Sequence, residues 1–148
     1  GITSIREDCR AMVLSVLEAI LRRSERDASY PFLDTKRNLL TGEDFSDDDP
    51  LRGRDTIYGW IQGRGIEALA EHAFQIDHIS NYNDDLSKAL CRRICAHIYR
   101  TVPVMESIRK SQGGRLPFMM TRTGQRLEVT SDGSVQPKSL PADRPTSY

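Results

Sequence analysis

The chain has 148 residues, of which 38% are hydrophobic and 28% are charged, a composition that is ordinary for one soluble globular domain. Basic and acidic residues number 21 each, so the charge balance does not favour nucleic acid, an anionic membrane or a polycationic partner. No apolar run is long enough to cross a membrane, and charged residues precede the first apolar stretch. We therefore expect no signal peptide and a cytoplasmic location.

The first predicted element is a helix from Ser4 to about Arg26. Its apolar residues recur in steps of three and four, as on a helix with one buried face: Ile5, Cys9, Met12, Val13, Val16, Leu17, Ile20 and Leu21. The next segment, residues 30–55, is interrupted by proline and glycine and carries three consecutive aspartates, so it predicts a loop. A loop of this length in a compact domain is more often functional than accidental.

Two further helices are expected after this loop. The second runs from about Tyr58 to Ser80, and the third starts at about Asp84 with Asn83 as its N-cap and with a bend at Pro103. Beyond the third helix, "RLPFMMTRTGQRLEVTSDGS" contains two extended runs around a Thr-Gly turn and predicts a small β-hairpin. The proline-rich tail, residues 135–148, is expected to be weakly structured.

This order of elements favours an all-α fold class, with a small β-hairpin between helical units. Helices joined by long loops suggest helical hairpins of a partial α/α toroid rather than a bundle with short loops. Three helices cannot close a ring, so we expect an apolar helix face to lie partly open, formed by Ile94, Ile98, Val102 and Met105. Self-association into a homo-oligomer, or poor solubility, would follow from such a face.

The cysteines and histidines do not predict a reactive or metal-binding centre. Cys9, Cys91 and Cys95 are expected to be reduced buried thiols, because His97 alone does not supply the further ligands that zinc requires. No metal and no cofactor are therefore expected. His72, His78 and His97 are interpreted as structural or solvated residues.

The stretch "RDTIYGWIQGRGIEALAEHA", residues 54–73, combines aromatic, amide and guanidinium groups with glycines that weaken a helix. If the helix begins near Gly59, Tyr58, Gln62 and Arg64 can surround its first turn, and Trp60 offers an apolar face to a sugar ring. The alternative is structural. Trp60 would then be a core residue, Arg64 would pair with Glu67 or a loop acid, and the glycines would permit tight helix contacts.

The motif "IYGWIQGR" resembles the Tyr-x-Trp-Leu-Gln-Gly-Arg motif on an early helix of the N-acylglucosamine 2-epimerase family. The preceding "YPFLDT", the later "GGRLPFMMTRTGQRL" and the terminal "RPTSY" are similar to segments around that motif, so the resemblance covers nearly the whole chain but only the N-terminal part of the family's barrel. Two departures are "ASYPF" in place of a Gly-Gly before the first aromatic residue and a longer acidic loop, so the sugar specificity is left open.

The resemblance implies a sugar 2-epimerase or aldose-ketose isomerase that acts on a small-molecule sugar. It implies Arg64 as the catalytic residue that polarises the carbonyl, with Tyr58, Trp60 and Gln62 as substrate-binding residues. The acid and base histidines of the family lie on later helices, so this chain alone is expected to be inactive. The alternatives are a glycoside-processing hydrolase or lyase on the same toroid, for which Glu67 and Glu71 are weak candidates, and a non-catalytic helical interaction domain.

Overall fold

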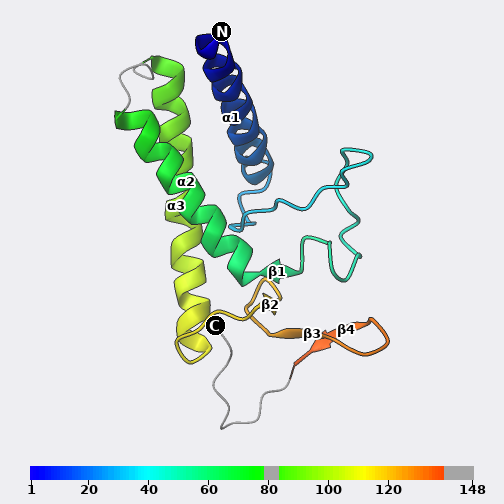
Figure 1. Cartoon of the computed structure of the whole chain (residues 1–148). Helices are drawn as coiled ribbons and strands as arrows, with labels where there is room; N and C mark the ends of the chain where they lie inside the picture. The colour runs from blue at the N-terminus through cyan, green and yellow to red at the C-terminus, as the bar shows by residue number, and fades with distance from the viewer. Residues whose placement is uncertain (79–83, 139–148) are drawn as a thin grey trace.

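The computed structural model describes residues 1–78 and 84–138, and this part of the chain is mostly helical (Figure 1). The helices are α1 (Ile2–Glu25), α2 (Gly59–His78) and α3 (Asp85–Ser111). The three predicted helices are thus confirmed, with described boundaries that differ by one or two residues from the predicted ones; the predicted end of the second helix at Ser80 lies outside the described residues. Residues 26–56 contain no helix or strand, as expected for the long loop.

The cap of α3 differs from the prediction. Asn83 lies outside the described residues, and Asp84 caps the helix by accepting hydrogen bonds from the Ser87 backbone N–H at 2.9 Å and the Ser87 hydroxyl at 2.8 Å. The helix continues through Pro103 to Ser111 without interruption.

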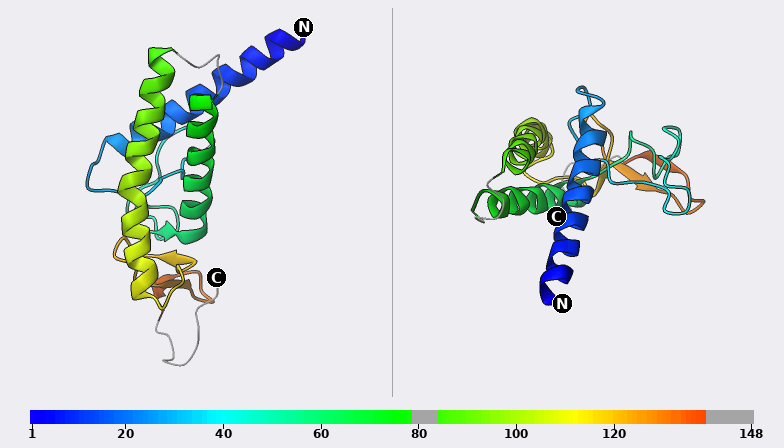
Figure 2. Two further views of the ribbon diagram at one scale, coloured as in Figure 1. Left: turned by 90° about the vertical axis from the view of Figure 1, so that its left-hand side faces the viewer. Right: turned by 90° about the horizontal axis from the view of Figure 1, so that it is seen from above.

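Helices α2 and α3 lie side by side and antiparallel, and α1 crosses them, packing on α3 less extensively than α2 does (Figures 1 and 2). The N-terminal part of α1 projects beyond the other two helices in both views of Figure 2. Within residues 1–78 and 84–138, no helix combines the length and hydropathy needed to cross a membrane.

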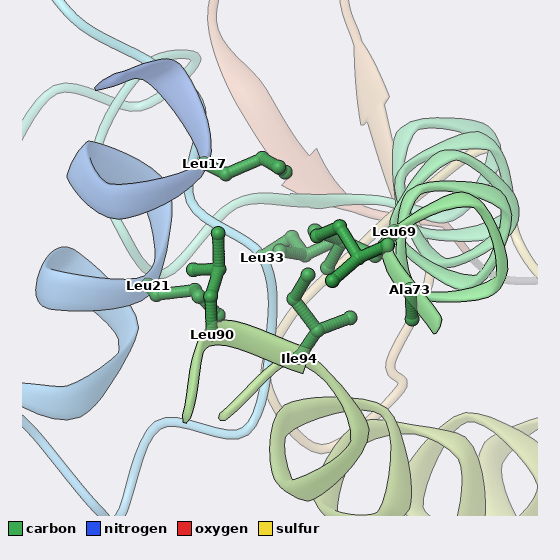
Figure 3. Close-up of a cluster of buried hydrophobic side chains, with 8 residues drawn as sticks. Leu17, Leu21, Leu33, Leu69, Ala73, Leu90 and Ile94 are labelled. Atoms are coloured by element: carbon green, nitrogen blue, oxygen red, sulfur yellow. The ribbon is translucent and has the colours of Figure 1, made fainter. Parts of the chain in front are cut away.

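The main core lies where the three helices meet, and Leu33 of the long loop reaches into its centre (Figure 3). All three helices contribute to it because each presents apolar residues at helical spacing. The buried members are Leu17, Leu21, Leu33, Leu69, Ala73, Ile76, Leu90 and Ile94.

A second core lies next to the start of α2 and includes residues of two short strands. Strand β1 (Ile57–Tyr58) pairs antiparallel with β2 (Met119–Met120), so a segment after α3 lies against the entrance to α2. The buried side chains here come from the loop, from these strands and from the second half of α3: Tyr30, Phe32, Ile57, Met105, Ile108 and Met120.

The predicted hairpin after α3 is partly correct. The Thr-Gly turn is present, with Gly124 at a φ of 85° and a bridge between Met120 and Arg126. Strand β3 (Leu127–Val129), however, pairs with β4 (Val135–Pro137) around a second turn at Gly133, whose φ is 84°. The prediction of a weakly structured tail is therefore wrong for residues 135–137, because Val135 pairs with Val129; residues 139–148 lie outside the described chain.

Two predictions about burial are also wrong. Ile94 and Met105 are buried in the two cores, because the face of α3 that they share packs on α1, α2 and the loop; among the four predicted residues Val102 is exposed. The cysteines are free, but Cys9 is exposed and Cys91 and Cys95 are only partly buried. The open apolar face lies instead on α1.

A buried histidine connects α1, α3 and the loop. The Ser24 hydroxyl lies 2.5 Å from His97 Nδ1, and His97 Nε2 lies 3.3 Å from the Thr101 hydroxyl, which donates to the Pro31 carbonyl at 2.5 Å. Both ring nitrogens are satisfied when His97 is neutral with its proton on Nε2. Burial, and secondarily the neighbouring Arg100, lowers the pKa of His97 to about 4.

The depressed pKa of His97 predicts acid destabilisation. The unfolded chain binds this proton near pH 6.5 and the folded chain binds it only near pH 4. Stability should therefore fall as the pH drops from about 6.5 to about 4, by up to about 3 kcal/mol at about 1.4 kcal/mol per pH unit. Urea unfolding across this range should show a steeper slope in the wild type than in His97→Gln, in which only carboxyl groups with lowered pKa values, such as Glu18 and Glu25, still contribute, with His78→Gln as the exposed control. Equal slopes in all three proteins would contradict the prediction.

Candidate functional site

The start of α2 is fixed by two hydrogen bonds from one buried side chain. Gln62 Nε2 donates to the Leu33 carbonyl and Gln62 Oε1 accepts from the Leu33 N–H, both at 2.8 Å. Gln62 is only 2% exposed. The amide therefore pairs with the loop backbone as a neighbouring β-strand would, and its hydrogen-bonding groups are occupied.

Ion pairs fold the long loop back onto α1. Arg23 pairs with Asp34 at 2.9 Å and also bonds to Asp44. Arg54 lies 3.4 Å from Asp27 and 3.8 Å from Asp34, and its guanidinium stacks over the Tyr30 ring. These contacts explain how a loop rich in charge and proline holds a defined path beside the start of α2.

Tyr58 connects this loop to the surface. Its hydroxyl donates to the Leu51 carbonyl at 3.1 Å, and its ring meets the Phe118 ring edge to face, with centroids 5.8 Å apart. Burial, and secondarily Asp49, raises the pKa of Tyr58. Lys36, whose pKa is lowered by burial, donates to the carbonyls of Gly53 at 2.5 Å and Thr56 at 2.6 Å.

The glycines of the motif have different roles. A Cβ on Gly59 would lie 2.3 Å from the Pro117 carbonyl oxygen, and one on Gly65 would lie 2.4 Å from Leu33 Cδ1. These two glycines permit close packing, as the structural interpretation predicted. A Cβ on Gly63 would meet nothing within 4 Å, so packing within the described chain does not explain this glycine.

The exposed side of the first two turns carries an aromatic ring and a guanidinium. Trp60 is 47% exposed, and Arg64 is exposed one turn further along the same face. Across residues 1–78 and 84–138, Arg64 has no hydrogen bond or ion pair. The interpretations of Trp60 as a core residue and of Arg64 as a partner of Glu67 are therefore wrong.

The four predicted site residues do not form one concavity. Tyr58 and Gln62 line a cavity of about 10 Å³, which has room for one water molecule and is too small for a sugar. Gln62 is two positions from Trp60 and two positions from Arg64, and side chains two positions apart on a helix point about 200° apart. The Gln62 amide therefore faces the loop and cannot bind substrate beside Trp60 and Arg64. Trp60 and Arg64 share one exposed face of α2, one turn apart, and Gly63 lies beside that face.

Phe118 is a residue that the sequence analysis missed. It is 48% exposed and packs on Tyr58, because the pairing of β1 with β2 brings residues 117–120 to the start of α2. The sequence gives little indication of an exposed Phe118, because "PFMM" is also an ordinary apolar run. We define the outer surface of α2 as Tyr58, Trp60, Gly63, Arg64 and Phe118.

Comparisons of the chain with protein-family models, with curated proteins and with solved structures find no match.

The glycines give a matched pair of stability predictions. Gly59→Ala should lower the free energy of unfolding by about 1–3 kcal/mol, because the new methyl group meets a backbone carbonyl. Gly63→Ala should raise it by about 0.5–1 kcal/mol, because alanine favours the helix and the space is open. Urea unfolding measures both, and a destabilised Gly63→Ala would show that this position is packed.

Removing the Gln62 amide should destabilise the fold. Gln62→Leu leaves the Leu33 N–H and carbonyl buried without partners, at a cost of about 2 kcal/mol or more. Gln75→Leu, at an exposed position of the same helix, should change stability by less than about 0.5 kcal/mol. Similar unfolding midpoints for the two variants would mean that the loop is held by other contacts.

Proposed function

We propose that this chain forms part of the carbohydrate site of a sugar 2-epimerase or aldose-ketose isomerase, of the N-acylglucosamine 2-epimerase type, on a partial α/α toroid. The observation that supports it is the exposed Trp60 with the unpaired Arg64 one turn away on the same face and open space over the neighbouring Gly63. A buried tryptophan or a paired arginine would have left no surface for a ligand.

The outer surface of α2 suits an uncharged polar ring. The Trp60 face can cover the C–H side of a pyranose, and the Arg64 fork can donate to two neighbouring oxygens. Because Gly63 has no side chain, a ligand can approach the helix backbone beside Trp60. Gln62 contributes indirectly, because it bonds the backbone of the long loop at Leu33, and the same loop accepts a hydrogen bond from the Tyr58 hydroxyl at Leu51.

Proton transfer next to a carbonyl requires an acid, a base and a group that stabilises the developing negative charge on oxygen. Arg64 is the candidate for the last role. His97 is buried and bonded at both ring nitrogens, and His78 Nδ1 bonds the Phe74 carbonyl at the far end of α2. His72 lines the apolar groove between α1 and α2. The acid and the base are therefore proposed to come from outside the described residues.

A hydrolase is less well supported. Glycosidases place two carboxyl groups on either side of the scissile bond. Glu67 and Glu71 lie one turn apart on the same exposed helix, and Glu71 accepts a hydrogen bond from Gln75 at 2.7 Å. Two carboxylates on one convex surface do not provide that arrangement.

Sugar binding can be tested on this chain because Trp60 is its one tryptophan. Titration with aldohexoses, ketohexoses and N-acetylhexosamines should give a saturable change in Trp60 fluorescence with at least one of them. Arg64→Ala should weaken that binding by roughly 10- to 100-fold, the effect of losing a charge-assisted hydrogen bond. Arg92→Ala, an exposed arginine of α3, is the matched control.

If no sugar changes Trp60 fluorescence in the folded chain, or if Arg64→Ala and Arg92→Ala bind equally well, the carbohydrate proposal fails. The interaction-domain alternative would then be preferred.

A further inference from the structure

Helix α1 has a second apolar face that nothing in the described chain covers. Leu17 and Leu21 pack in the core, but Met12 is 68% exposed and Val16 is 53% exposed. The exposed residues follow one another in steps of four, three, four and three: Ile5, Cys9, Met12, Val16 and Ala19. This is the spacing of the contact seam of a coiled coil, and we call these five residues the α1 seam.

Charge is absent from the centre of this face. Between Arg10 and Arg22, Glu18 is the one charged residue of α1, and its carboxylate bonds Arg93 of α3 at 2.5 Å and Arg22 of α1 at 2.6 Å. A helix that is apolar on two sides is normally covered on both.

A groove next to the seam enlarges the apolar surface. It has a volume of about 350 Å³ and lies between α1 and α2. Small residues of α2, Gly65 and Ala68, form part of its wall, opposite Val13 and Val16 of α1. A helix resting on the seam would therefore also contact α2, since small side chains allow close approach.

The charges that flank the seam identify the occupant. Asp8, Ser15 and Arg22 are spaced by seven residues and lie along one edge of it. Arg22 Nε donates to Glu18 Oε1 of the same helix at 2.6 Å, and the Arg22 side chain is 71% exposed, so its terminal N–H groups can still reach a carboxylate of a partner. In an antiparallel pair of identical helices with the two-fold axis at Ser15, each Asp8 lies opposite Arg22 of the other copy. A parallel pair would instead place Asp8 opposite Val13, which leaves the carboxylate beside an apolar side chain.

We propose that the α1 seam binds a second copy of this chain, as an antiparallel, two-fold symmetric α1–α1 pair. Met12 of each copy then contacts Val16 of the other, Cys9 contacts Ala19, and two Asp8–Arg22 pairs flank these layers. The interface is isologous, so the same residues serve both copies and the assembly closes as a dimer. This proposal uses a different surface from the sugar proposal and does not depend on it.

Sedimentation equilibrium of the full chain, over roughly a hundredfold range of concentration, tests the dimer. We expect a monomer–dimer equilibrium that Met12→Glu and Val16→Glu abolish. Leu86→Glu, which changes an 84% exposed residue of α3, should leave it intact. A monomer at all concentrations, or equal effects of Met12→Glu and Leu86→Glu, would overturn the proposal. Since Met12 is exposed, unchanged circular dichroism should confirm that the variant folds.

Charge exchange tests the antiparallel register. Asp8→Arg should raise the dissociation constant by about tenfold, because each copy then places like charges together. Asp8→Arg with Arg22→Asp should restore it to within about threefold of the wild type. If the dissociation constant of the double variant stays as high as that of Asp8→Arg, the antiparallel register is wrong.

Cross-linking tests the position of the axis. In a Cys9→Ser background, Ser15→Cys should form a covalent dimer with a short bismaleimide, located by mass spectrometry, because the two side chains meet at the axis. Asp8→Cys should not form one, because the two copies of residue 8 lie about 21 Å apart along the helices. Equal cross-linking of both variants would indicate a parallel pair and overturn the proposal.

Discussion

The two hydrogen bonds between the Gln62 amide and the Leu33 backbone hold the fold together at its centre. Leu33 carries the loop into the core between the three helices (Figure 3), where its own N–H and carbonyl would be buried without partners. Gln62 satisfies both groups from α2. Gly65, almost one turn further on, leaves space for the Leu33 side chain, so α2 and the loop fit as one unit.

The helical period divides the short motif into two functions. Gly59, Gln62 and Gly65 face inward and secure packing, whereas Trp60, Gly63 and Arg64 face outward with open space around them. One stretch of sequence therefore both builds the fold and presents a surface. This division also explains the density of glycines, since inward glycines are required by contacts with Leu33 and Pro117, and the outward one has no such cause within the described chain.

Local patterns predicted the helices but not the neighbours of each face. The three- and four-residue steps identified α1, α2 and α3, because amphipathic spacing is a property of the segment itself. The burial of Ile94 and Met105 and the exposure of Met12 depend on which helix packs where, and both faces look alike in sequence. The β1–β2 pair escaped prediction for a similar reason, because two-residue strands far apart in the chain carry little periodic signal. At the site, Gln62 and Arg64 are two positions apart on α2, so the helical period directs their side chains about 200° apart and the motif residues cannot all face one ligand.

Helix α1 illustrates how one element can be stabilised on one side and left open on the other. Its inner side is secured by apolar packing of Leu17 and Leu21 and by Arg93, which bonds both Glu18 and Glu25 across to α3. Because Glu18 is held in these ion pairs, no charged side chain of the middle of α1 lies on its outer side. The outer side is then flanked by Asp8 and by Arg22, about two turns from the centre on either side; Arg22 bonds Glu18 through Nε, and its side chain is 71% exposed. A face that is neutral in the middle and oppositely charged at its two ends is complementary to its own reversed copy, which follows from the sequence spacing as much as from the fold.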